Sequence, residues 1–224
     1  MLRLFAIRCS LLILALLAGC ASQPERASTY TVKRGDTLYA IAWRHKLDWE
    51  DLARWNGVGP GHVIHVGQVL KLYPSRASHA AARPAPVSPA RQTAPAPAAP
   101  PVQWQWPVTG GTATLTTRPN GGQGLTVSGH LGEDIRAAAA GNVVYTGSGL
   151  LGYGQLVILK HNATYLSAYG HTQSVAVREG ETVSAGQRIA TMGPGPNGDP
   201  MLYFEIRING TPGNPLTFLP TRAN

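Results

Sequence analysis

The fold of this chain is decided by GYGQLVILKHNATYLSAYGHTQSVAVREGETVSAGQRIATMG at 152–193 and by MLYFEIR at 201–207. Apolar residues in this stretch alternate or form short blocks, at 156–159, 165–169 and 201–206, and Gly, Asn or Pro separates the blocks. No long run follows the 3.6-residue period of a helix. The pattern therefore predicts an all-β domain of antiparallel strands joined by tight turns.

The same stretch resembles the core of the lysostaphin/LytM-type zinc peptidases. Two signatures of that family are a strand ending in Tyr-x-His and a later strand reading His-x-His-Phe-Glu. Here the first is kept as YGH at 169–171, whereas the second reads MLYFE at 201–205. The resemblance implies the duplicated hybrid motif fold of that family with its metal chemistry removed.

Composition limits the number of domains and the classes of partner. The chain has 224 residues, enough for one ordinary domain and a small second one, and its 26 Gly and 18 Pro indicate that part of it is not packed core. The formal charge of +8 falls by two when a leader carrying Arg3 and Arg8 is removed. A basic protein suits nucleic acid, an anionic membrane or the bacterial cell wall, so the compartment has to decide between them.

Residues 1–19 have the layout of a signal peptide, with two arginines, an apolar core and small residues before Cys20. LAGC at 17–20 resembles the bacterial lipobox, in which cleavage exposes the cysteine for lipid attachment; an ordinary signal cut elsewhere is the alternative. Ala21 replaces the Asp that retains enterobacterial lipoproteins at the inner membrane. The resemblance therefore implies a lipidated tether at 20–29 that is anchored in the outer membrane and faces the periplasm.

The compartment also bears on the cysteines and on the partners. Cys9 is lost with the leader and Cys20 is consumed by the lipid, so no disulfide is expected although the periplasm is oxidising. Export argues against nucleic acid as a partner, and the sequence has no basic motif interleaved with aromatic residues.

Residues 30–73 predict a small α+β module of βααβ order. YTVKRGDTL at 30–38 begins as an alternating strand, and Asp36 or Thr37 can cap the helix that follows. A second short helix comes next, and VGQVLKL at 66–72 supplies the return strand. These spaced matches resemble the LysM domain, which binds glycan containing N-acetylglucosamine.

The LysM resemblance places the glycan groove between the loops at 35–37 and 57–64. It implies that peptidoglycan glycan strands contact Gly35, Asp36, Thr37, Asn56 and Ile64. The alternative is that Gly35, Asp36 and Asn56 serve only turns and caps. His62 and His65 suggest a metal site, but two histidines without a third ligand are expected to be exposed, solvated loop residues.

Residues 74–103 predict a linker rich in Pro and Ala. Between Pro74 and Pro101 there are three arginines and no acidic residue. Such a segment buries too little apolar surface to fold, so we expect it to be disordered, extended and partly polyproline, with a reach of roughly 90 Å when fully stretched.

Residues 104–224 predict the last domain, which opens with WQWPV at 104–108. Within it, GNVVYTG at 141–147 and VILKH at 157–161 are especially similar to NlpD-type proteins, a family of outer-membrane LysM lipoproteins that activate cell-wall amidases. The leader, the LysM module, the linker and the final domain follow one another in that family's order.

Active LytM-type peptidases hold zinc with a His-x-x-x-Asp motif and the second His of His-x-His, which leaves a fourth position for the attacking water. Aligned without a gap, these three positions fall on Gly122, Thr126 and Tyr203. Met201 replaces a catalytic histidine, and only His171 is kept. Because a phenol is a poor zinc ligand and a thioether a poorer one, we expect no zinc, no other cofactor and no hydrolysis.

A second register exists because HLGED at 130–134 also has the spacing of the metal motif. It would require deleting about eight residues, a whole turn and strand, since GEDIRAAAAGNVV at 132–144 matches the family's next strand without a gap. Under either register Tyr203 takes the third position.

What remains is a groove that the alignment lines with Gly122, Thr126, His171, Met201 and Tyr203, a surface suited to a protein partner. In NlpD-type proteins such a groove is implied to engage an N-acetylmuramoyl-L-alanine amidase and to displace the helix that blocks its zinc site. The alternatives are that Tyr203 and Met201 only fill space and that His171 is an ordinary strand residue.

Three functions are compatible with these patterns. The favoured one is a peptidoglycan-binding outer-membrane lipoprotein that is not an enzyme and that activates an amidase through a degenerate LytM-type domain, in septal wall splitting and daughter-cell separation. The second is a zinc endopeptidase acting on peptidoglycan cross-links with His130, Asp134 and His171. The third is a structural tether between the outer membrane and the wall.

Overall fold

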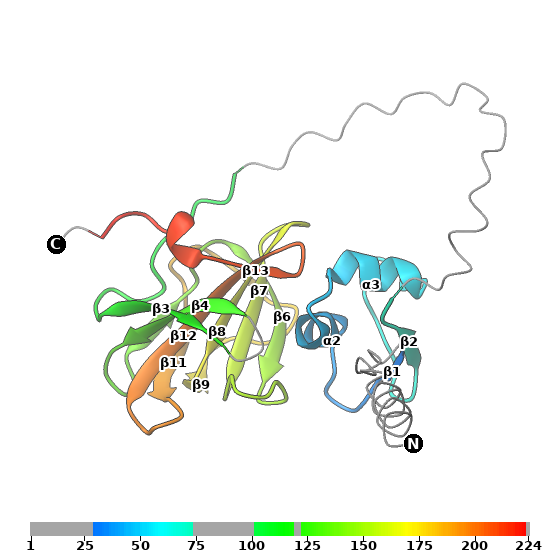
Figure 1. Ribbon diagram of the computed structural model, residues 1–224, viewed down its shortest axis with the longest axis horizontal. Helices are drawn as coiled ribbons and strands as arrows, with labels where there is room; N and C mark the ends of the chain where they lie inside the picture. Colours follow the sequence, from blue (N-terminus) through cyan, green and yellow to red (C-terminus); the bar gives the residue numbers. More distant parts are fainter. Residues whose placement is uncertain (1–28, 74–100, 119–121, 223–224) are drawn as a thin grey trace, which may run out of the picture.

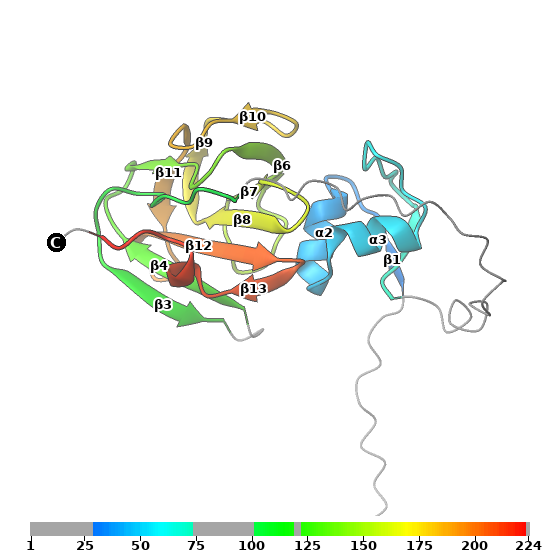
Figure 2. The same ribbon diagram turned by 90° about the horizontal axis from the view of Figure 1, so that it is seen from above.

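A computed structural model describes residues 29–73, 101–118 and 122–222 of the chain. A small helical module and a larger β domain lie side by side, with helix α2 between them (Figures 1 and 2). The predicted signal peptide, the lipidation site Cys20 and most of the predicted linker lie outside the described residues. Within those residues, no helix is long and apolar enough to cross a membrane.

The small module confirms the predicted βααβ order. Its elements are β1(Thr29–Thr31), α2(Leu38–His45), α3(Trp49–Trp55) and β2(Val69–Lys71). The two strands pair antiparallel, with Tyr30 opposite Leu70. Of the two predicted caps of the first helix, Thr37 is the one used, because its hydroxyl accepts the Ala40 N–H at 3.0 Å.

The β domain confirms the predicted all-β antiparallel fold. Its elements are β3(Ala113–Thr117), β4(Gln123–Ser128), β5(Asp134–Arg136), β6(Gly141–Gly147), β7(Leu156–Lys160), β8(Tyr165–Gly170), β9(Thr172–Val175), β10(Thr182–Val183), β11(Arg188–Pro194), β12(Pro200–Ile208), β13(Thr211–Gly213) and the 3₁₀ turn η1(Pro215–Thr217). Hydrogen-bonded neighbours run in the order β10-β6-β7-β8-β12-β11-β5, while β4 and β13 also pair with β12, β3 pairs with β4, and β9 pairs with β11.

Strand β12 is the centre of the domain, and both of its faces are buried. Side chains alternate along a strand, so its residues divide into two sets. One set, Leu202, Phe204 and Ile206, packs in the core of the β domain. The other set, Tyr203, Glu205 and Arg207, projects from the opposite face, where Arg207 reaches the LysM module. The second set carries a buried acid and a buried base, which the sequence pattern alone would place in solvent.

Glu205 and Arg207 form an ion pair at the boundary between the two domains. Arg207 Nε donates to Glu205 Oε1 at 2.6 Å, and the side chains are only 2% and 0% exposed. Arg207 Nη1 donates to the Trp43 carbonyl at 2.7 Å, and its guanidinium stacks 3.5 Å from the centre of the Trp43 ring. The hydroxyls of Tyr153 and Tyr203 donate to Glu205 Oε2 at 2.9 and 3.2 Å. This set of partners is what buried charges require.

Further contacts join the domains, among them the following two. Lys160 of β7 places its ammonium 4.0 Å from the centre of the Trp49 ring. The β12–β13 turn approaches the α2–α3 turn so closely that a Cβ on Gly210 would lie 2.2 Å from the Leu47 carbonyl oxygen. Cation–π contacts of this kind each stabilise by about 0.5–2 kcal/mol. The LysM module is therefore docked on the β domain through specific contacts.

The buried ion pair gives a stability prediction. Arg207→Ala should lower the free energy of unfolding by about 3–5 kcal/mol, because it leaves the Glu205 carboxylate buried without a cation. Urea unfolding at pH 7 measures it. The control is Arg188→Ala, since Arg188 is 56% exposed and lies 3.7 Å from Asp134, and it should cost less than about 1 kcal/mol. Equal costs for the two variants would contradict this account of the pair.

Candidate functional site

Two of the three predicted metal-ligand positions, Thr126 and Tyr203, meet where β4 and β12 lie side by side. Thr126 is directly opposite Tyr203 in the β4–β12 register, and Gly170, which precedes His171, is opposite Tyr203 on the other side. Directly paired residues project from the same face of a sheet. Gly122 directly precedes β4, four residues before Thr126, and its carbonyl accepts the Arg118 N–H at 2.8 Å.

Tyr203 is buried, with 2% of its surface exposed. Its ring occupies the gap left by Gly124, where a Cβ would lie 2.6 Å from the phenol carbon, and its hydroxyl donates to Glu205. Burial, and then the negative charge of Glu205, raise the pKa of the Tyr203 phenol far above its ordinary value. The phenol therefore lies beneath the surface, which agrees with the alternative that Tyr203 fills space above the sheet; its part in a partner groove stays a prediction.

Arg118 covers Tyr203, and the sequence reasoning missed it. Its guanidinium carbon lies 3.9 Å from the centre of the Tyr153 ring and 4.7 Å from that of Tyr203. Nη2 donates to the Gly152 carbonyl at 2.5 Å, and the Arg118 N–H donates to the Gly122 carbonyl at 2.8 Å. A single arginine in a turn between two strands gives no sequence signal for such a position, because the rings that hold it come from distant segments.

His171 sits beside this cluster in an unusual backbone conformation. Its φ is 59°, in the left-handed region that few non-glycine residues adopt. Two backbone hydrogen bonds hold it there, from His171 N–H to the Tyr153 carbonyl at 2.7 Å and from Gly193 N–H to the His171 carbonyl at 2.8 Å. Burial, and then the Arg118 charge, lower the pKa of His171 below its ordinary value, so the imidazole is neutral at pH 7.

Met201 occupies the position of the replaced catalytic histidine at the edge of the same cluster. It lies opposite Ser128 of β4 and Gly193 of β11. The side chain is partly buried and packs over Gly195, where a Cβ would lie 2.4 Å from the sulfur. Met201 is thus both a packing residue and the more accessible apolar member of the cluster.

The residues of the second register lie away from Tyr203. The His130 imidazole is 96% exposed in the loop before β5. Asp134 pairs with Arg136, whose Nη2 lies 2.8 Å from its carboxylate. Asp134 lies in β5, whereas Thr126 lies in β4 directly opposite Tyr203.

The side chains at the three positions do not fit zinc. Gly122 has no side chain to bind a metal ion. The Thr126 hydroxyl lies 2.9 Å from that of Thr116, and the Tyr203 hydroxyl donates to Glu205. The Arg118 guanidinium above them is a like charge that would repel a metal ion. Across residues 29–73, 101–118 and 122–222, no group of three His, Cys, Asp or Glu side chains is arranged to hold one.

The predicted glycan-contacting side chains of the LysM module mostly hold the module's own fold. The Asp36 carboxylate accepts the Tyr30 hydroxyl at 2.7 Å and the Lys33 N–H at 2.9 Å. Asn56 joins α3 to β2, since its amide donates to the Lys71 carbonyl at 2.9 Å and accepts the Lys71 N–H at 2.6 Å. These contacts support the turn-and-cap interpretation of both side chains.

The remaining predicted residues of the groove leave mainly backbone and apolar surface for a ligand. Gly35 has a φ of 81° in the turn before the Thr37 cap, and Ile64 is partly buried against the module's core. Glycan binding by these five residues stays a prediction.

His62 corrects the expectation of a solvated histidine pair. Its ring packs edge-on against Trp49, with 4.8 Å between ring centres, and its Nδ1 lies 3.3 Å from the Tyr39 hydroxyl. His65 is exposed, as expected. Burial, and then Lys160, lower the pKa of His62, so it is a neutral packing residue at pH 7.

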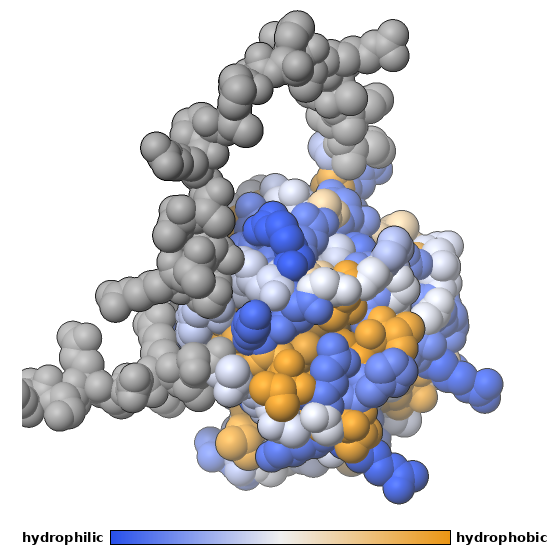
Figure 3. All heavy atoms as spheres, turned by 90° about the vertical axis from the view of Figure 1, so that its right-hand side faces the viewer, coloured by the Kyte–Doolittle hydropathy of each residue, from blue (hydrophilic) through white to orange (hydrophobic). Residues whose placement is uncertain are grey.

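The LysM end of the molecule carries apolar surface. Figure 3 looks at this end and shows a hydrophobic patch among hydrophilic side chains. The large apolar residues of the module that are most exposed belong to the loop before β2 and to β2 itself; they are Val63, Val66 and Val69, at 68%, 71% and 58%.

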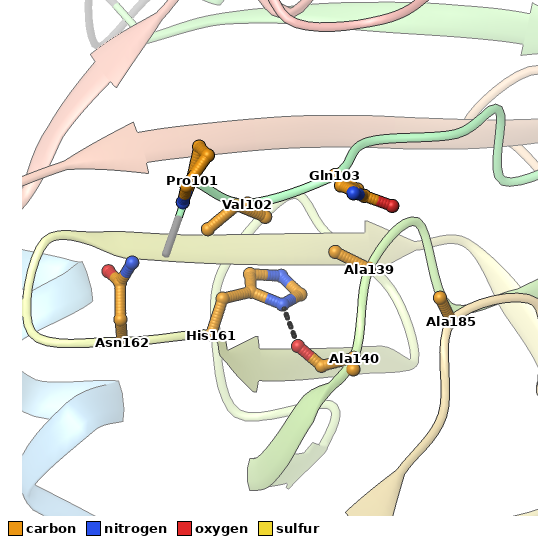
Figure 4. Close-up of a pocket in the computed structure, with 8 residues that line it drawn as sticks. All are labelled: Pro101, Val102, Gln103, Ala139, Ala140, His161, Asn162 and Ala185. Atoms are coloured by element: carbon orange, nitrogen blue, oxygen red, sulfur yellow. Dashed lines mark hydrogen bonds between the residues drawn. The ribbon is translucent and has the colours of Figure 1, made fainter. Parts of the chain in front are cut away.

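A separate pocket of about 320 Å³ lies where the start of the β domain passes His161 (Figure 4). The His161 Nδ1 lies 2.8 Å from the Ala140 carbonyl, which can only accept, so Nδ1 carries the proton. Nε2 lies 2.8 Å from the Ser167 hydroxyl. Burial lowers the pKa of His161 to about 4, which makes it a structural histidine.

Comparison with known proteins identifies the class of protein first. Residues 30–72 match the LysM domain, and residues 120–215 match peptidase family M23. The chain is therefore a LysM protein with an M23-type β domain.

The comparison with whole proteins identifies the family. The chain is 43% identical over 244 residues to the lipoprotein NlpD/LppB homolog of Pseudomonas aeruginosa, covering 92% of this chain and 81% of that protein. It is 34% identical over 259 residues to the murein hydrolase activator NlpD of Escherichia coli (strain K12), covering 87% and 68%. It is 35% identical over 218 residues to the outer membrane antigenic lipoprotein B of Histophilus somni, covering 83% and 65%. The chain belongs to the NlpD/LppB family of lipoproteins.

The buried histidine predicts a pH dependence. The pKa of His161 is about 4 in the folded state and about 6.5 in the unfolded chain, so the unfolded chain binds the proton first as the pH falls. Stability should be complete above pH 6.5 and should fall by on the order of 2 kcal/mol at pH 5. Urea unfolding at pH 7 and pH 5 measures this.

His161→Gln should lose less stability than the wild type between these two pH values. His130→Gln, at the exposed histidine, should follow the wild type and serves as the control. Parallel losses in all three proteins would show that His161 is not the group that titrates.

Proposed function

We propose that this chain is a peptidoglycan-binding lipoprotein on the periplasmic face of the outer membrane that activates an N-acetylmuramoyl-L-alanine amidase. In this proposal its M23 domain does not cut the wall. The names of two relatives support it, because one is a murein hydrolase activator and another an outer membrane lipoprotein. The LAGC sequence ending at Cys20 supports the lipid anchor.

The observation that carries the proposal is the arrangement of Arg118 over Tyr203. A hydrolytic zinc site needs three ligands with available lone pairs and an open fourth position for water. Here the phenol that takes the third position is a hydrogen-bond donor to Glu205, and a guanidinium lies 4.7 Å from its ring centre. The site therefore presents a fixed cation to an incoming molecule in place of an activated water.

A fixed guanidinium suits a protein partner. It carries five N–H donors, of which Nη2 already donates one to Gly152, and its planar fork matches the two oxygens of a carboxylate. His171, between β8 and β9, is only 9% exposed but lies near enough to Arg118 for that charge to lower its pKa, and Met201 of β12 adds a partly buried thioether. A partner with an acidic side chain flanked by apolar residues fits this surface, and docking of such a segment would draw it away from the amidase's own active site.

The LysM module has a separate part in this proposal. It holds the chain on the glycan strands, so that the M23 domain acts where the wall is being split. A structural tether would need the lipid and the LysM module but no client enzyme. The two functions differ in one assay, the release of dye from labelled peptidoglycan by a purified amidase with and without the leaderless chain.

Arg118→Ala should reduce the stimulation of that amidase at least tenfold, because the partner's carboxylate loses a charge-assisted hydrogen bond of about 1.5–3 kcal/mol. The matched control is Arg222→Ala, since Arg222 also stacks on an aromatic ring, at 3.8 Å from the centre of Trp106. Arg222→Ala should stimulate like the wild type. Full stimulation by Arg118→Ala would remove this surface from the mechanism.

Tyr203→Ala is a poor probe of the same surface. The phenol is buried, so its removal would leave a cavity and cost about 3–5 kcal/mol of stability. Loss of stimulation in that variant would report unfolding as readily as lost docking. Arg118, which is partly exposed, avoids this ambiguity.

A further inference from the structure

The predicted glycan-binding loops of the LysM module, at 35–37 and 57–64, face the β domain as well as solvent. A cavity of about 430 Å³ lies between the module and the β domain. Its LysM wall contains Thr37 and His62, from the two loops in which a glycan groove is predicted, and Tyr39 of α2. Its other wall contains Asn142 of β6 and Glu179 of the turn before β10. The volume is within the roughly 300–1,000 Å³ range of small-molecule sites.

Contacts between the two domains hold the two walls of the cavity in place. Lys160 of β7 places its ammonium 4.0 Å from the centre of the Trp49 ring. The Trp49 ring in turn packs against Tyr39 of the LysM wall, with 5.0 Å between ring centres. The Arg207 guanidinium stacks on Trp43 of α2, one turn along the helix from Tyr39. The cavity is therefore built by contacts between the domains.

The chemistry of the walls selects a neutral, hydroxyl-rich ligand with apolar faces. The LysM wall offers an aromatic cluster of Tyr39 with His62, and His62 is uncharged at neutral pH. The opposite wall offers a carboxylate at Glu179 and an amide at Asn142, which can accept from and donate to hydroxyl and acetamido groups. The Glu179 charge would repel the carboxylates of peptide stems.

We propose that the two domains together form one binding site for a chain of β-linked N-acetylhexosamine units, with Glu179 and Asn142 supplying contacts that the LysM module lacks. The proposal rests on the glycan binding assigned above to the LysM module. It adds that the M23 domain reads the glycan too. Bound glycan would then hold the two domains in the docked arrangement, with the Arg118 surface in a fixed orientation to the strand.

The test uses the leaderless full-length chain and a neutral pentamer of N-acetylglucosamine, with the dissociation constant measured by calorimetry. Glu179→Ala should weaken binding about tenfold, the effect of losing one hydrogen bond to a charged group. The matched control is Glu181→Ala in the same turn. Each carboxylate accepts one backbone N–H, from Thr146 at 2.8 Å and from Arg178 at 3.1 Å, so both variants lose the same kind of internal bond.

The outcomes separate the two proposals. Weaker binding by Glu179→Ala with unchanged binding by Glu181→Ala supports the shared site. Unchanged binding by Glu179→Ala overturns it, and tighter binding overturns it as well, because that result would mean that the β domain obstructs the LysM loops. Absence of binding by the wild-type chain would overturn the glycan part of the proposed function together with this inference.

Discussion

The structure depends on burying Glu205 and Arg207 on the inner face of β12. Removing two charges from water costs several kcal/mol per ion, and the cost is offset only when both ions are fully hydrogen-bonded. The β domain supplies partners for the carboxylate through Tyr153 and Tyr203, but the guanidinium finds its carbonyl partner in Trp43 of the LysM module. The two domains are therefore bound to each other by the need to satisfy one buried cation.

The same network connects the domain boundary to Tyr203, the position that the alignment assigns to a zinc ligand. Hydrogen bonds run from Tyr203 to Glu205, from Arg207 to Glu205, and from Arg207 to Trp43. The phenol of Tyr203 needs the space that Gly124 leaves. The aromatic faces of Tyr153 and Tyr203 attract the Arg118 cation. In the M23-type domain these side chains stabilise one another where the alignment expects zinc ligands, and the proposed docking surface lies outside them.

The sequence predicts the fold well because its signals are local. Alternation, turn residues and the Thr37 cap are all visible over a few residues, and the ungapped alignment places Thr126 beside Tyr203. The misses are contacts between distant segments. Glu205 and Arg207 are typical of an exposed strand face until a second domain covers them, and Arg118 is one arginine in a turn. His62 is partly buried because Trp49 and Tyr39 lie beside it. Such positions depend on the packing of whole domains.

The central claim is that this M23 domain works by docking and has no place for a metal. The most direct test is the zinc content of the purified leaderless chain, measured by inductively coupled plasma mass spectrometry after incubation with excess zinc and removal of free ion. The account predicts far less than one zinc per chain. One tightly held zinc per chain, lost when His171 is changed to Ala, would contradict it.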